Sequence, residues 1–170
     1  MTLTPPRQTG SPTSARTNAE TLPSRSPGVR CFQSAVEFPA ALEAIPPARR
    51  ELHTLLCKSG LAGIADIVAL AAEELMANAV AHGCHGLAPD TTVDMAITCD
   101  GRQVTLKVED PSSDLPCVLP GTSDEEGGRG MLLVDAFTDR WGVEKPSTGG
   151  AGKAVWMELA CSPAEGAEAS

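Results

Sequence analysis

Three polar side chains stand four residues apart in the apolar stretch EELMANAVAHG, residues 73–83. Glu74, Asn78 and His82 form an i, i+4, i+8 row, and this spacing places side chains along one edge of an α-helix. A carboxamide oxygen suits Mg²⁺, which prefers oxygen ligands, and a glutamate one turn earlier can accept a proton from a hydroxyl group. The simpler alternative is an edge row of ordinary polar residues on an amphipathic helix.

The helix that carries this row is expected over residues 61–83, and its phase separates two adjacent glutamates. At about 100° per residue, Glu73 falls on the side opposite the apolar arc, whereas Glu74 lies at the border of that arc. The apolar arc comprises Ile64, Val68, Ala71, Leu75 and Ala79. Glu73 is therefore expected to face water and Glu74 to border the core or a pocket. Asn78 is a poor helix former, which weakens the purely structural interpretation.

Two downstream segments carry further groups of this kind. Asp110 ends the strand-like stretch VTLKVED, and a carboxylate at a strand end can accept a hydrogen bond from an exocyclic amine such as that of adenine. An Asx-type turn before Pro111 is an equally good explanation of Asp110. In GGRGMLLV, residues 127–134, Gly128 and Gly130 open a helix whose free N–H groups suit a phosphate. A glycine-rich helix start is more often only a turn.

The elements that must position these groups follow the order β, α, α, β, β, loop, α, β, β. Hairpins dominate, the turn CDGR is a strong hairpin signal, and alternating βαβ units are missing. The order predicts an α+β two-layer sandwich, a mixed and mainly antiparallel sheet with helices on one face. The expected segments are a strand in 29–39, helices in 46–60 and 61–83, a hairpin in 91–110, a helix in 129–140 and a hairpin in 141–159.

The 170-residue length predicts one domain with tails. Residues 1–28 and 162–170 are rich in small and polar side chains, so we expect disordered tails around a domain at 29–161. The net charge of −9 argues against a nucleic-acid or anionic-membrane partner. No apolar run suits a membrane span or a secretory signal, and the six scattered cysteines are typical of a reduced, cytoplasmic protein.

The segment HGCH offers a different kind of site. His82, Cys84 and His85 could ligate zinc, but no second ligand pair stands at a familiar spacing, so a metal-binding module is the weaker alternative.

The combination of these motifs is more specific than its parts. EELMANAVAHG, a strand ending in Asp110, a Pro- and Ser-rich loop, GRGMLLVDAFTDRWGV and GKAVWMEL follow in that order. Over roughly residues 30–160 the chain resembles the histidine-kinase-like ATPase superfamily, which has the Bergerat fold. Within it, the chain is most similar to the small RsbW-type anti-sigma-factor serine/threonine kinases.

The resemblance implies a role for each motif. Asn78 would coordinate the Mg²⁺ of bound ATP, Glu74 would be the catalytic base, and Asp110 would bind adenine. The second glycine box, Gly128 to Met131, would wrap the phosphates; it comprises Gly128, Arg129, Gly130 and Met131, with Met131 in place of the usual leucine. Residues 112–127 would form the ATP lid.

Two departures from the family pattern bear on the nucleotide site. The glycines that usually follow the aspartate are replaced in DPSSD, and a Pro–Ser loop is stiffer. In GKAV, Ala154 stands where a threonine is common, which removes a hydroxyl group that could help to hold adenine.

The resemblance implies an ATP- and Mg²⁺-dependent serine/threonine protein kinase that binds a sigma factor and phosphorylates a STAS-type anti-anti-sigma antagonist, as a possible homodimer. A non-catalytic ATP-binding regulator that acts by protein–protein contact is the alternative, and the altered glycine boxes favour it. A scaffold that binds partners without nucleotide is a further alternative.

Overall fold

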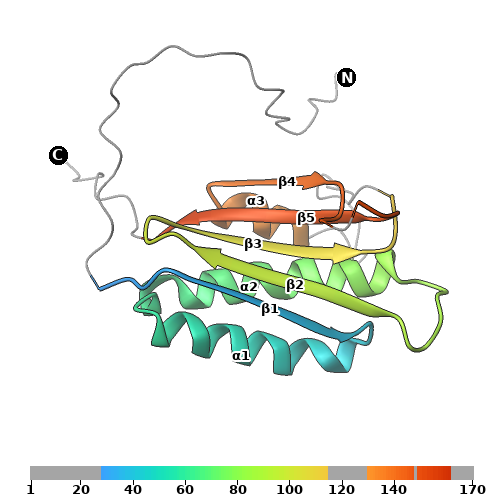
Figure 1. The fold of residues 1–170 in the computed structure, drawn as a ribbon, viewed down its shortest axis with the longest axis horizontal. Helices are drawn as coiled ribbons and strands as arrows, with labels where there is room; N and C mark the ends of the chain where they lie inside the picture. Colours follow the sequence, from blue (N-terminus) through green and yellow to red (C-terminus); the bar gives the residue numbers. More distant parts are fainter. Residues whose placement is uncertain (1–27, 115–129, 148, 162–170) are drawn as a thin grey trace, which may run out of the picture.

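The computed structural model describes residues 28–114, 130–147 and 149–161, which form a sheet covered by helices (Figure 1). Their order is the one predicted from the sequence, with the addition of two short helical turns. The elements are β1 (Phe32–Pro39), η1 (Leu42–Ala44), α1 (Ile45–Lys58), α2 (Ala62–Asn78), η2 (Ala79–Gly83), β2 (Thr92–Cys99), β3 (Gln103–Asp110), α3 (Gly130–Phe137), β4 (Arg140–Glu144) and β5 (Lys153–Ala160).

The five strands form one sheet in the order β1-β2-β3-β5-β4, and every neighbouring pair is antiparallel. The helices α1, α2 and α3 lie on one face of this sheet (Figure 1). The predicted α+β two-layer sandwich is therefore confirmed, and the described strands contain no parallel pair. Hairpins join β2 to β3 and β4 to β5, which explains why these two pairs are antiparallel, because a turn between neighbouring strands reverses the chain.

The turn between β2 and β3 shows how the sequence sets the register of the central strands. Gly101 has φ +87°, a left-handed conformation that glycine adopts without steric cost. The Asp100 carboxylate accepts hydrogen bonds from the N–H groups of Arg102 and Gln103 at 2.8 and 2.9 Å. These backbone hydrogen bonds lower the pKa of Asp100, so the ionised carboxylate stabilises the turn.

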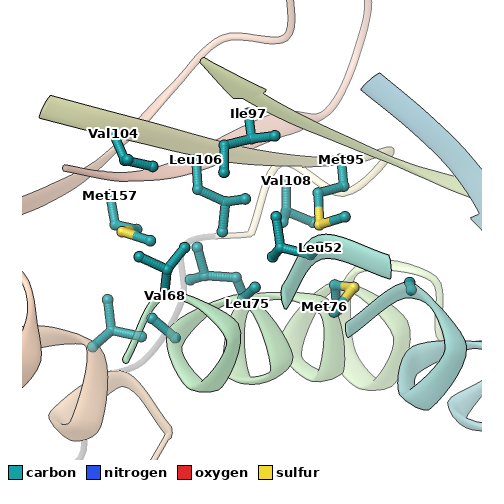
Figure 2. Packing of buried hydrophobic residues seen from close by; sticks show 14 of the residues in the cluster. Leu52, Val68, Leu75, Met76, Met95, Ile97, Val104, Leu106, Val108 and Met157 are labelled. Atoms are coloured by element: carbon teal, nitrogen blue, oxygen red, sulfur yellow. The ribbon is translucent and has the colours of Figure 1, made fainter. Parts of the chain in front are cut away.

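The core lies between the sheet and the helices (Figure 2). On β3, Val104, Leu106 and Val108 are fully buried and alternate with half-buried residues, as expected for a strand with one face toward the core. The apolar arc predicted for the long helix is buried throughout. The same alternation turns Asp110, the last residue of β3, toward the helices, so the side chain of Asp110 is held by the packing of its own strand.

The long helix changes geometry at its end, where a single helix was expected to run to residue 83. The α-helix stops at Asn78 and continues as the π-helical turn η2, in which the N–H of Cys84 bonds to the carbonyl of Ala79 at 2.9 Å. A π-turn is wider than an α-turn, so residues after Asn78 leave the edge row that Glu74 and Asn78 share. His82 is accordingly exposed and does not continue the row.

Several sequence predictions fall outside the described residues. They concern the N-terminal tail up to residue 27, the lid from residue 115 to 127, the glycine-box residues Gly128 and Arg129, and the C-terminal tail from residue 162.

Candidate functional site

Glu74 occupies the position that its helical phase predicts, at the border between α2 and α3. It is half-buried, and its carboxylate lies against the first residue of α3, because a Cβ added to Gly130 would be 2.3 Å from Glu74 Oε2. Burial raises the pKa of Glu74, and the neighbouring charge of Glu73 raises it further. A carboxylate with a raised pKa is a stronger proton acceptor, which suits a general base.

Glu73 contrasts with its neighbour. Its carboxylate pairs with Arg49 of α1 at 3.2 Å, and 36% of the side chain is exposed. The adjacent glutamates therefore have different surroundings, as the helical phase predicted, although Glu73 is paired as well as solvated.

Asn78 lies one helical turn beyond Glu74, at the last residue of α2. Its Nδ2 atom is buried, and no hydrogen-bond partner for this atom lies within the described residues. A buried amide without a partner costs free energy, so its retention in a native site calls for an explanation. A bound ligand supplies one, because the two ends of a carboxamide exchange by a half-turn and can present oxygen to a cation or N–H to a phosphate. Asn78 is therefore a suitable Mg²⁺ ligand.

Asp110 ends β3 with a side chain that is only 1% exposed. Its Oδ1 atom accepts hydrogen bonds from the backbone N–H of Ser112 at 2.9 Å and from Nζ of Lys153 at 2.9 Å. The contact with Ser112 is the Asx-type turn considered from the sequence, and it coexists with a carboxylate aimed at the helix layer. Within the described residues, Oδ2 makes no hydrogen bond, so this oxygen is available to accept one from a ligand.

Lys153 was not identified from the sequence as a site residue. It is the register partner of Asp110 on β5, and its side chain is 9% exposed. The sequence contains a signal for this position. Lys153 stands two and four residues before Val155 and Met157, which face the core, and alternate residues of a strand share one face. A lysine at an inward-facing strand position needs a buried anion as its partner.

Gly83 is a second residue that the motif analysis did not assign. A Cβ at this position would lie 2.3 Å from Cγ of Asp110 and 2.4 Å from its Oδ1 atom. The π-helical turn brings the Gly83 backbone against the carboxylate of Asp110, and only a residue without a side chain fits there. The glycine after AVAH therefore serves the Asp110 end of the site. Its φ is not positive, so backbone conformation does not explain why a glycine stands there.

The two described residues of the second glycine box, Gly130 and Met131, have different roles. Gly130 begins α3 and is buried, and its free N–H can point toward a phosphate because it belongs to the first turn of a helix. Met131 is 2% exposed and belongs to the hydrophobic core, so its side chain anchors α3. Gly128 and Arg129 lie outside the described residues.

Ala154 does not lie beside Asp110, contrary to the expectation that a hydroxyl group at this position would help to hold adenine. The register pairs Ala154 with Glu109 and Glu144, and strand alternation turns it to the sheet face away from the helices. Lys153 holds the place beside Asp110, so the alanine does not alter the helix-facing site.

The three candidate zinc ligands of HGCH differ in exposure. His82 and His85 are exposed, whereas Cys84 is buried. In the part of the chain that the structure describes, no group of three His, Cys, Asp or Glu side chains is placed to hold a metal ion.

A shallow depression lies on α1, away from the candidate site. It is lined by Arg50, Glu51, Thr54, Leu55 and Lys58 and contains none of the candidate site residues.

In the described segments, no helix combines the length and the apolar character needed to cross a membrane.

The fold and the site together define the class of protein. A glutamate and an asparagine one turn apart on a helix edge lie on the same side of the sheet as a strand-end aspartate and a glycine that opens the next helix, as in an ATP-binding domain of the ATPase type. Residues 38–159 match the family of histidine kinase-like ATPase domains, and the chain belongs to this family. Membership supports an ATP-binding, ATPase-like regulatory protein.

One relative has a local match. An uncharacterized protein of Streptomyces coelicolor is 37% identical over 62 residues, which cover 35% of this chain and 58% of the relative.

Proposed function

We propose that the protein binds Mg·ATP between α2, the ends of β3 and β5 and the start of α3, and transfers the γ-phosphate to a serine or threonine of a protein partner. One observation carries this proposal. Glu74 and Asn78 share one helix edge, where Glu74 has a raised pKa and lies against Gly130, and Asn78 carries a buried amide without a partner in the described residues.

Each described group has a part in this proposal. Asp110 accepts a hydrogen bond from the exocyclic amine of adenine through Oδ2, and the N–H groups at the start of α3 face the phosphates. Asn78 would hold Mg²⁺ through its carboxamide oxygen, and the ion would neutralise part of the charge on the phosphates.

Glu74 would act on the incoming hydroxyl group. The oxygen of the serine or threonine attacks the γ-phosphorus, the bond from the γ-phosphorus to the β,γ-bridging oxygen breaks, and ADP leaves. The hydroxyl proton passes to the Glu74 carboxylate. Burial favours this transfer, because it makes the ionised carboxylate a better acceptor.

The proposed partners are a sigma factor and a STAS-type anti-anti-sigma antagonist, and the protein would regulate transcription by contacting them, as a possible homodimer in the cytoplasm. Similarity to RsbW-type kinases supports these partners. The acidic chain, with a net charge of −9, suits protein partners better than nucleic acid.

A non-catalytic ATP-binding regulator is the second candidate function. It is favoured by Ser112 and Asp114, which stand at the glycine positions of the family pattern Asp-x-Gly-x-Gly after Asp110. Such a regulator would use ATP to change its affinity for a partner without transferring phosphate.

Calorimetry with Mg·ATP comes first in testing these proposals. Wild type is expected to bind and Asn78→Ala to lose binding, and the absence of a binding signal from wild type would reject both candidate functions. Partners are then captured from a native lysate with and without ATP and incubated with ATP labelled at the γ-phosphate.

The adjacent glutamates provide a matched pair of variants for the transfer step. Glu74→Gln is expected to lower the transfer rate about 10²- to 10⁴-fold, the usual contribution of a general base. Glu73→Gln is expected to lower the rate far less, because Glu73 pairs with Arg49 at the surface and acts on Glu74 only through its charge. Binding of ATP without transfer by wild type to any captured partner would favour the regulator over the kinase.

A further inference from the structure

A buried ion pair lies at the Asp110 end of the site. Nζ of Lys153 donates a hydrogen bond to Oδ1 of Asp110 at 2.9 Å, and the side chains are 9% and 1% exposed, respectively. Removing two charges from water is costly, and an apolar pair of similar volume is often as stable or more stable. Stability alone therefore does not explain this pair in a strand phase otherwise occupied by residues such as Val155 and Met157.

The geometry of the pair assigns different tasks to the two carboxylate oxygens. Oδ1 accepts from both Lys153 and the N–H of Ser112, and the same Nζ lies 3.4 Å from the carbonyl oxygen of Ser112. Oδ2 makes no hydrogen bond to the described residues. Gly83 lies directly against the carboxylate and limits its rotation. Asp110 is thus held through Oδ1, and Oδ2 is left to accept a hydrogen bond from a ligand.

The chemistry of a carboxylate determines what the free Oδ2 atom of Asp110 can recognise. An ionised carboxylate only accepts hydrogen bonds, whereas a protonated carboxyl group also donates one. Adenine carries an amino donor at C6, and guanine or hypoxanthine carries a keto acceptor at that position. A carboxylate oxygen placed at this edge of the base attracts the amino group and repels the keto group.

Lys153 is the side chain that holds this carboxylate in place. Its Nζ binds Oδ1 at 2.9 Å and leaves Oδ2 free for a ligand. Among the described residues, the Cys84 thiol also lies near the pair; burial raises its pKa, Asp110 raises it further, and Lys153 acts in the opposite direction.

We propose that Lys153 is a positioning residue that sets the base specificity of the site, by holding Oδ1 of Asp110 so that Oδ2 points to the base and the site accepts a 6-amino purine and rejects a 6-keto purine. This inference rests on the proposed binding of ATP with its base at Asp110.

The test compares the affinities for ATP and inosine triphosphate, each with Mg²⁺, by calorimetry. Wild type is expected to prefer ATP by at least about tenfold, the discrimination that a specific hydrogen-bonded base contact provides. Lys153→Met is expected to bring the ATP to inosine triphosphate ratio near one, mainly through weaker ATP binding. Lys107→Met is the matched control, because Lys107 pairs with Glu144 on the opposite sheet face, and its ratio is expected to match that of wild type.

A double variant separates an action through Asp110 from a general structural effect. Asp110→Asn is expected to lose the preference for ATP, and adding Lys153→Met to Asp110→Asn is expected to change the ratio no further. This double variant also buries no unpaired charge, so it serves when Lys153→Met alone does not fold. A further drop on removing Lys153 from the Asp110→Asn protein would refute the proposed route.

Two failures are distinguishable. Wild type that binds neither nucleotide would reject the proposed function, and this inference with it. Wild type that binds ATP selectively, together with a folded Lys153→Met that keeps the full selectivity, would overturn the role of Lys153 and leave the proposed ATP site intact.

Discussion

Replacing Gly83 by alanine tests whether the π-helical turn and Asp110 form one unit. The added Cβ would lie 2.3 Å from Cγ of Asp110, 2.4 Å from Oδ1 and 2.7 Å from Oδ2, all closer than a Cβ contact permits. Asp110 cannot simply turn away, because Lys153 and the N–H of Ser112 hold it. The substitution must therefore displace the carboxylate or the turn.

The magnitude follows from two opposing terms. Overpacking of a close contact costs about 1–3 kcal/mol, and replacing a helical glycine by alanine returns up to about 1 kcal/mol. The expected net loss of stability is about 1–2 kcal/mol, which lowers Tm by about 2–8 °C. A displaced Asp110 also loses its proposed hydrogen bond to adenine, so ATP affinity is expected to fall about 10- to 150-fold.

Gly63→Ala is the matched control for this substitution. Gly63 lies in α2, the helix that η2 continues, and an added Cβ would have nothing within 4 Å. This variant is expected to gain up to about 1 kcal/mol and to bind ATP as wild type does. Thermal unfolding and calorimetry measure both effects.

Two results would contradict the reasoning. A Gly83→Ala protein as stable as Gly63→Ala would show that the close contact with Asp110 does not exist. A destabilised Gly83→Ala protein with unchanged ATP affinity would show that Asp110 does not bind the base.

Three further predictions follow from single sites. Asn78→Ala is expected to leave the stability of the nucleotide-free protein unchanged or raise it by about 1 kcal/mol, because a buried unpaired amide disappears; a large loss in urea unfolding would mean that the amide has a structural partner. Burial raises the folded-state pKa of Glu74 above its unfolded value, so its stabilising contribution is complete at low pH and declines as pH rises through the folded-state pKa. Glu74→Gln is therefore expected to gain stability relative to wild type between acidic and neutral pH, and a pH-independent difference in urea unfolding would argue against this. Alkylation followed by peptide mass spectrometry is expected to label the exposed Cys31 and Cys57 rapidly and Cys161 slowly, because burial raises the pKa of Cys161 to about 12; equal rates would contradict this burial.

Local patterns predicted most of the fold. The Asp-Gly turn, the strand alternation and the apolar arc of the long helix each depend on neighbouring residues, and each is found as expected. The end of the long helix was not predicted, because α- and π-turns carry the same apolar residues and differ only in which carbonyl accepts the hydrogen bond.

The candidate site could be predicted only where one element carries it. Glu74 and Asn78 share an edge of α2, so helical phase alone placed them together, and the strand phase of Asp110 turned it inward. The ion pair between Asp110 and Lys153 joins residues 43 positions apart, and it required the register of β3 against β5.

The order of the elements and the direction of Glu74, Asn78 and Asp110 followed from the sequence alone, because they depend on repeats of two and 3.6 residues along the chain. Only the tertiary structure decided which of those side chains meet. Packing of α3 on α2 brought Gly130 against Glu74, and the π-helical turn brought Gly83 against Asp110. Strand register then placed Lys153, and not Ala154, beside the aspartate, because one residue of offset in a strand turns a side chain to the opposite face of the sheet.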